Sequence, residues 1–107
     1  MRDMLAEHRL HPSDFILPMF ICEGSGCEEP IASLRGVSRW SVDRIAQRAK
    51  EAASLGIPCV ALFPNTPGGL RTDDAREALN PGNLICRATK SIKDAVPEIG
   101  VLTDVAL

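Results

Sequence analysis

The chain has 107 residues, of which 45% are hydrophobic and 24% are charged, and it carries a formal net charge of −2. This length allows one domain, and the composition is that of an ordinary globular protein. The charge gives no basic field for nucleic acid, and no apolar run approaches the roughly 20 residues that span a bilayer. We therefore expect no nucleic-acid partner and no membrane segment. We also expect a cytoplasmic location, with four free cysteines, because the N-terminus lacks the apolar core of a signal peptide.

The first 14 residues are polar and mixed, which predicts an N-terminal arm or a short frayed helix ahead of a domain that starts at residue 15. The apolar run at 15–21 follows the turn signal Ser13-Asp14 and predicts the first strand. Pro18 lies inside this run and has no N–H to donate to a ladder. We therefore expect β-pairing to be irregular, or to face a sheet edge, at Pro18.

Residues 22–40 contain several glycines and prolines and show no periodicity, which predicts a long connection. Its length favours functional packing or a subunit contact over a bare linker. A helix is predicted over 41–55, with Ser41 as its N-cap and Asp43 near its positive end. Gly56 is the expected stop signal.

A second strand is predicted at 59–63, followed by a loop rich in turn-forming residues. Asn80-Pro81-Gly82 predicts the cap and first turn of a second helix over 81–96. A third, buried strand is predicted over 100–107, after Pro97 and Gly100.

The order strand, helix, strand, helix, strand predicts a parallel α/β fold with right-handed crossovers. Two such crossovers place both helices on one face of the sheet and leave the other face uncovered. Parallel strands require both faces to be buried, so the cover must come from more chain, from a partner or from closure into a barrel. We predict the first three βα units of a (β/α)8 barrel, incomplete over residues 15–107.

Few residues are candidates for chemistry. His8 with His11, and Cys22 with Cys27, lack the further ligands of a metal site, so we expect no metal site in this chain. All three lysines, Lys50, Lys90 and Lys93, fall on predicted helices, whereas catalytic groups of parallel α/β enzymes lie at strand C-termini. Asp104 is the one ionisable residue in an apolar strand, which makes it the candidate catalytic residue. The alternative is a structural carboxylate bonded to loop amides.

Several segments together resemble porphobilinogen synthase, also called δ-aminolevulinic acid dehydratase, in register over nearly all of the chain from about residue 5. The segments are Phe15-Ile16-Leu17-Pro18-Met19-Phe20, Pro30-Ile31-Ala32-Ser33, Gly36-Val37, Leu55-Gly56-Ile57-Pro58, Ala61-Leu62-Phe63-Pro64, Asn80-Pro81, Pro97-Glu98 and Thr103-Asp104-Val105-Ala106-Leu107. The match covers the front third of such a protein.

This resemblance implies a TIM barrel that condenses two molecules of 5-aminolevulinate into porphobilinogen, the pyrrole precursor of haem. It implies that the Schiff-base lysines lie beyond Leu107, that this chain alone is inactive, and that Asp104 assists proton transfer. Zinc-type members carry a cysteine where this chain has Ala106, so the resemblance implies magnesium instead of catalytic zinc, bound chiefly by residues outside this chain. It also implies a homo-oligomer, typically an octamer. Family members usually have a longer N-terminal arm than this chain, and that arm wraps a neighbouring subunit. The alternative is a self-standing α/β binding module that dimerises through its open sheet face.

Overall fold

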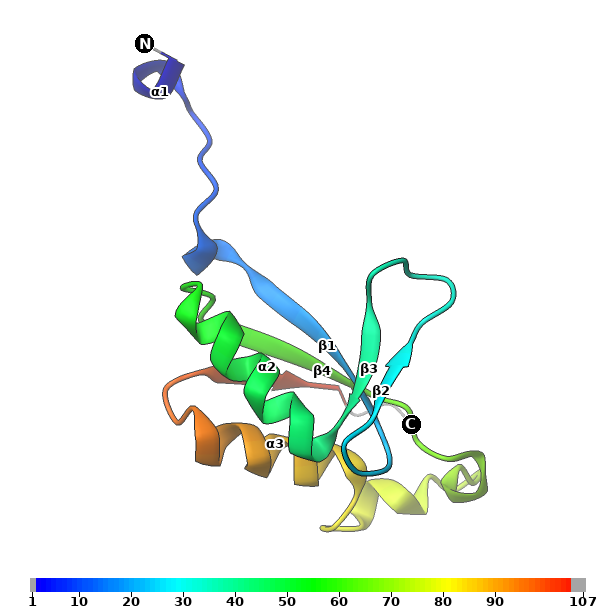
Figure 1. Cartoon of the computed structure of the whole chain (residues 1–107). Helices are drawn as coiled ribbons and strands as arrows, with labels where there is room; N and C mark the ends of the chain where they lie inside the picture. Colours follow the sequence, from blue (N-terminus) through cyan, green and yellow to red (C-terminus); the bar gives the residue numbers. More distant parts are fainter. Residues whose placement is uncertain (1, 105–107) are drawn as a thin grey trace.

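A computed structural model describes residues 2–104 of the chain (Figure 1). Its elements, in chain order, are α1 (Arg2–Leu5), a 3-10 turn (Pro12–Asp14), β1 (Ile16–Cys22), β2 (Glu28–Pro30), β3 (Ser38–Ser41), α2 (Val42–Ser54), β4 (Cys59–Pro64), two further 3-10 turns (Gly68–Leu70 and Arg76–Leu79), α3 (Leu84–Ala95) and β5 (Gly100–Thr103). The last three residues of the predicted third strand, Ala106 among them, lie outside the described residues.

The strands form one sheet in the order β2-β3-β1-β4-β5, in which only β2 runs antiparallel to its neighbour. β1 pairs with β4 from Ile16↔Cys59 to Ile21↔Pro64. β4 pairs with β5 from Cys59↔Gly100 to Leu62↔Thr103. The predicted parallel arrangement of three strands joined by two helices is confirmed.

Helices α2 and α3 lie side by side on the same face of this sheet (Figure 1). The core lies between them and the sheet and consists of apolar residues from both layers: Met19, Ile21, Ile45, Ala49, Ala52, Val60, Leu62, Leu84, Ala88, Ile92, Val96 and Ile99. Within residues 2–104 the opposite face has no covering layer, as predicted. Ile16, Phe63 and Leu102 on that face are 54%, 45% and 53% exposed.

The ends of α2 follow from its sequence. Ser41 is the N-cap residue and Asp43 lies in the first turn. At the other end Gly56 has a φ of +86°, a conformation that glycine adopts without steric cost. The Gly56 N–H donates to the carbonyl of Ala53 and the Ile57 N–H to that of Ala52, which satisfies carbonyls that the helix leaves unpaired.

The structure differs from the sequence prediction in two places. Residues 22–40 contain the β2–β3 hairpin, and β3 pairs in parallel with the end of β1 from Phe20↔Arg39 to Cys22↔Ser41. The second helix begins at Leu84, and its N-cap is Asn83, whose side chain accepts a hydrogen bond from the Cys86 N–H. Asn80 instead closes a turn before the helix by accepting from the Gly82 N–H.

The N-terminal segment extends away from the sheet, with α1 at its tip (Figure 1). The described part of the chain measures 58 × 30 × 27 Å, and its radius of gyration is 16.1 Å, against about 13 Å for a compact domain of this length. Met4, Leu5 and Leu10 are 83%, 77% and 82% exposed along this segment. Large apolar side chains are therefore presented on an extension.

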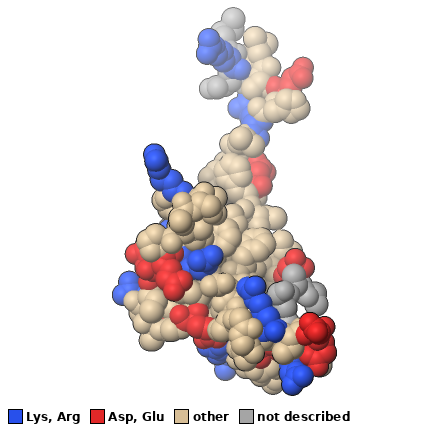
Figure 2. All heavy atoms as spheres, turned by 90° about the vertical axis from the view of Figure 1, so that its right-hand side faces the viewer, with Lys and Arg blue, Asp and Glu red and all other residues tan. Residues whose placement is uncertain are grey.

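Acidic and basic side chains are intermixed on the face turned to the viewer in Figure 2, without a broad area of one sign. Among residues 2–104, none of the helices combines the length and apolar character needed to cross a membrane.

Candidate active site

The carboxyl ends of parallel strands β1, β4 and β5 meet at one edge of the sheet, where α/β enzymes place their catalytic groups. Asp104 is the first residue after β5. Because Thr103 pairs with Leu62, Asp104 lies level with Phe63, the next residue of β4. The structure therefore puts the candidate carboxylate at the edge where a barrel enzyme would use it.

Asp104 lines a shallow cavity of about 230 Å³ on the open face, together with Ala61, Leu62, Phe63, Leu102 and Thr103. The Phe63 ring stacks on that of Phe20 from β1, with ring centroids 5.6 Å apart and planes at 28°. This aromatic pair gives the cavity a firm apolar wall beside a carboxylate. A carboxylate next to an apolar wall is a suitable arrangement for handling a proton on a small organic substrate.

The expectation of a fully buried third strand is wrong for this part of the chain. Leu102, Thr103 and Asp104 are all exposed, because the face on which Leu102 stands is uncovered within residues 2–104. Whether Asp104 transfers protons or acts as a structural carboxylate stays a prediction.

A hydrogen-bonded network fixes the loop that follows β1 at the same edge. The Ser41 hydroxyl donates to Asp43 Oδ1 at 2.5 Å, and the Gly26 N–H donates to Asp43 Oδ2 at 2.8 Å. The hydroxyl also accepts from the Cys27 N–H at 3.0 Å. The bond from Ser41, followed by that from Gly26, holds the pKa of Asp43 below its ordinary value. Ser41 thus binds the loop instead of capping α2 with its side chain.

An ion pair ties this loop to α3. The Arg87 guanidinium donates to Glu23 Oε1 at 2.5 Å and to the carbonyl of Gly82 at 2.8 Å. The hydrogen bond with Glu23 raises the pKa of Arg87. The loops that follow β1 and precede α3 are therefore fastened together at the carboxyl edge of the sheet.

The other candidates lie away from this cavity. Lys50 is on α2, and Lys90 and Lys93 are on α3, as predicted. Lys93 Nζ donates to the carbonyls of Pro97 and Ile99 at 2.8 and 2.7 Å, which is a structural role. Hence no lysine among residues 2–104 stands at the carboxyl end of a strand.

The histidines and cysteines are not among the residues that line this cavity. His11 caps the turn at Pro12–Asp14 by accepting from the Ser13 N–H. All four cysteines are free thiols, and burial raises the pKa of the Cys22 thiol. Residues 2–104 contain no group of three or more histidine, cysteine, aspartate or glutamate side chains placed to hold a metal ion.

Phe63 is 45% exposed, so it stands outside the core of the described residues. Its alternation with the buried Leu62 places it on the open face, beside Asp104. The period of two along 59–63 was the signal, but the run is apolar on both faces, so the sequence did not reveal which side chains face the cavity.

A sheet of parallel strands with helices on one face only, and with a carboxylate on its open face at the carboxyl edge, is characteristic of a segment of a barrel enzyme. A family model described as delta-aminolevulinic acid dehydratase matches residues 1–107. The chain belongs to the delta-aminolevulinic acid dehydratase family, as its sequence motifs predicted.

Curated relatives and a crystal structure agree with this assignment. The chain is 49% identical to the enzyme of Bradyrhizobium diazoefficiens over 106 residues, which cover 99% of this chain and 30% of the relative. It is 38% identical to that of Chlamydia pneumoniae, over 99% of this chain and 32% of the relative. The crystal structure of the Toxoplasma gondii enzyme, in complex with the reaction product porphobilinogen, superposes with a TM-score of 0.93 at 36% identity, covering 99% of this chain and 30% of that one. The chain thus spans about a third of the proteins that it matches.

Proposed function

We propose that this chain forms the first three βα units of a porphobilinogen synthase, which condenses two molecules of 5-aminolevulinate into porphobilinogen for haem and related pigments. The observation that carries this proposal is the match over 99% of the chain, at a TM-score of 0.93, to an enzyme bound to porphobilinogen. Because the chain corresponds to 30% of that enzyme, it acts as one part of a larger barrel. Alone, it does not turn over substrate.

Within that barrel, Asp104 accepts and returns a proton at the substrate's amino group or at its Schiff base. The support is its position on the apolar cavity beside Phe63, at the carboxyl edge of the sheet. Amine attack and iminium formation both require a proton to move, and a carboxylate at hydrogen-bonding distance is suited to this. The Schiff-base lysine comes from another part of the barrel, since Lys50, Lys90 and Lys93 are on the helices.

The metal that we propose for the complete enzyme is magnesium, held chiefly by side chains from elsewhere in the barrel. This agrees with residues 2–104, which contain no group of three or more histidine, cysteine, aspartate or glutamate side chains placed to hold a metal ion. No step assigned to this chain depends on a metal ion. Ala106, in place of the cysteine of zinc-type members, favours the magnesium branch.

The assembly proposed for the whole enzyme is a homo-oligomer, typically an octamer, in the cytoplasm. The exposed Met4, Leu5 and Leu10 support it, because an apolar extension of this kind is stabilised by contact with another subunit. The four free thiols support a reducing compartment.

The test is a two-part enzyme. The chain is co-expressed with the C-terminal part of the Bradyrhizobium relative, beginning just after its match to this chain, and pyrrole formation from 5-aminolevulinate is measured with magnesium present. Asp104→Asn is expected to lower the rate at least a hundredfold, the scale of general acid–base catalysis. The matched control is Asp73→Asn, a change to an exposed loop carboxylate. An Asp104→Asn enzyme as active as the control would refute the role of Asp104.

A further inference from the structure

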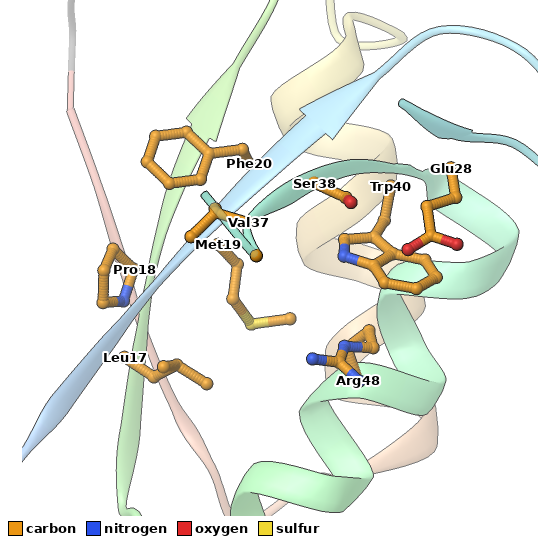
Figure 3. A pocket seen from close by; sticks show the side chains of 10 residues that line it. Leu17, Pro18, Met19, Phe20, Glu28, Val37, Ser38, Trp40 and Arg48 are labelled. Carbon is orange, nitrogen blue, oxygen red and sulfur yellow. The ribbon is translucent and has the colours of Figure 1, made fainter. Parts of the chain in front are cut away.

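Phe20 on β1 faces the same side of the sheet as the cavity that Asp104 lines. Figure 3 looks into a second cavity, of about 340 Å³, beside β1, and the Phe20 ring is turned away from Trp40 and Arg48 on the helix side. Met19, the residue before it, is 5% exposed in the core under the helices, so the alternation along β1 puts Phe20 on the open face. The Phe20 ring is therefore free to pack against other side chains of that face.

The register of the sheet puts three side chains in one row on this face. Phe20 pairs with Phe63 in the ladder between β1 and β4. Thr103 pairs with Leu62, so Asp104 is level with Phe63 on the next strand. Neighbouring strands lie about 4.8 Å apart. Phe63 therefore stands between Phe20 on one side and the candidate carboxylate on the other.

The Phe63 ring depends on Phe20 for support. Phe63 is 45% exposed, and its neighbour along β4 on the same face is Ala61, whose side chain is a single methyl group. The Phe20 ring, by contrast, stacks on that of Phe63, with centroids 5.6 Å apart and planes at 28°. Offset stacking at this separation is a favourable arrangement of two aromatic rings. The stack therefore gives a half-exposed ring a preferred orientation.

The orientation of Phe63 matters because its ring is a wall of the cavity beside Asp104. Ala61, Phe63, Leu102 and Asp104 are among the residues that line this cavity of about 230 Å³, whereas Phe20 is not. Phe20 thus acts on the cavity through Phe63. A smaller side chain at residue 20 would let the Phe63 ring move toward β1 and away from Asp104, and the cavity would widen.

We propose that Phe20 is a positioning residue of the enzyme: by holding the Phe63 ring next to Asp104, it sets the width of the cavity around the amino end of 5-aminolevulinate. This inference rests on the proposed function, in which Asp104 acts at the substrate's amino group or at its Schiff base. Phe20 has no ionisable group and does not line the cavity, so it takes no part in the proton transfer. Its effect falls on substrate fit, and therefore on KM and on the choice between molecules of different size.

The first experiment follows the Phe63 ring in the chain alone. With ring-labelled phenylalanine, NMR is expected to show contacts between the ring protons of Phe20 and Phe63. Phe20→Leu is expected to shift the Phe63 ring resonances toward those of an unstructured peptide, because the ring current of Phe20 is lost. Phe20→Tyr keeps a ring at residue 20 and should leave them nearly unchanged. The matched control is Phe15→Leu, at a 44% exposed position before β1 that does not line the cavity.

The second experiment uses the two-part enzyme. Phe20→Leu is expected to raise KM for 5-aminolevulinate roughly two- to tenfold, the scale of one aromatic pair, with kcat within about twofold and an unchanged pH profile.

Two acids without the amino group then measure the width of the cavity: levulinate, and 4-oxoheptanoate, which extends one carbon beyond the position of the amino nitrogen. Phe20→Leu is expected to shift the ratio of their dissociation constants, measured by calorimetry, at least threefold in favour of 4-oxoheptanoate. Phe20→Tyr and Phe15→Leu should preserve both KM and the ratio. A ratio measured on one sample does not depend on how much of the two parts has assembled.

Three results would overturn this inference: Phe63 resonances that do not move in Phe20→Leu, a KM and an inhibitor ratio equal to those of Phe15→Leu, and a fall in kcat with KM unchanged. The last result would place Phe20 in the chemical step. A combined sample that shows the shifted ratio but forms no pyrrole would leave this inference standing and count against the proposed function. A sample that binds neither acid would overturn both.

Discussion

The contribution of each face of the sheet to stability can be compared by replacing one leucine with alanine on each face. Leu62 on β4 is 1% exposed and belongs to the core under the helices, whereas Leu102 on the neighbouring β5 is 53% exposed on the open face. Leu62→Ala removes a fully buried side chain and leaves a cavity, which costs about 3–4 kcal/mol. Leu102→Ala removes a side chain that is already half in water, and its open site leaves no cavity. Half of the roughly 2 kcal/mol for burying a leucine gives about 1 kcal/mol.

Urea unfolding followed by far-ultraviolet circular dichroism measures both values in the isolated chain. We expect the Leu62→Ala midpoint to fall about three times as far as that of Leu102→Ala, with unchanged denaturant slopes. In the complex with the C-terminal part of a relative, the Leu102→Ala penalty is expected to rise toward that of Leu62→Ala, because the open face becomes the barrel interior. Equal penalties for the two variants in the isolated chain would refute the one-sided core.

Three further predictions concern local structure. Lys93→Met is expected to destabilise the chain by about 1–2 kcal/mol in urea, since it removes two charged hydrogen bonds to carbonyls, whereas Lys50→Met on α2 should have little effect. Ala75→Gly should raise the free energy of unfolding by up to about 1 kcal/mol, because Ala75 has a φ of +52°; a lower urea midpoint would contradict this. The lowered pKa of Asp43 means that its contribution is complete above its ordinary value of 3.8 and is lost as the pH falls through the folded-state value. Asp43→Asn should therefore be less stable than the original chain at pH 7 and equal to it near pH 2; a pH-independent difference would contradict that cause.

The parts of the fold that sequence reasoning predicted are those with a long repeating pattern. The apolar spacing along 42–53 and 85–96 specified two one-sided helices, and the handedness of crossovers then specified the side of the sheet that they cover. Asp104 was selected as a candidate for a similar reason: a carboxylate in an apolar strand is rare, and its place in the strand order puts it at the carboxyl edge. Its catalytic role stays a prediction.

The hairpin was missed because its strands are short and carry little apolar alternation. β2 is Glu-Glu-Pro and β3 is Ser-Arg-Trp-Ser. Both form strands because of the strands that they pair with, and their own residues have little preference for a strand. The start of α3 was misplaced because two asparagines, at 80 and 83, are both good caps. The choice of Asn83 depends on its further bond to the carbonyl of Glu77, which no local pattern predicts. The pairing of β3 with only Phe20 to Cys22 of β1 likewise could not be predicted without the observed strand register.

The most direct measurement of the central claim is pyrrole formation from 5-aminolevulinate by three samples: this chain, the C-terminal part of the Bradyrhizobium relative, and the two together. If the chain is the first part of a barrel whose lysines lie elsewhere, only the combined sample turns over substrate. Turnover by the chain alone would contradict the account. So would an inactive combined sample together with a chain that unfolds cooperatively as a defined dimer, the behaviour expected of a self-standing module.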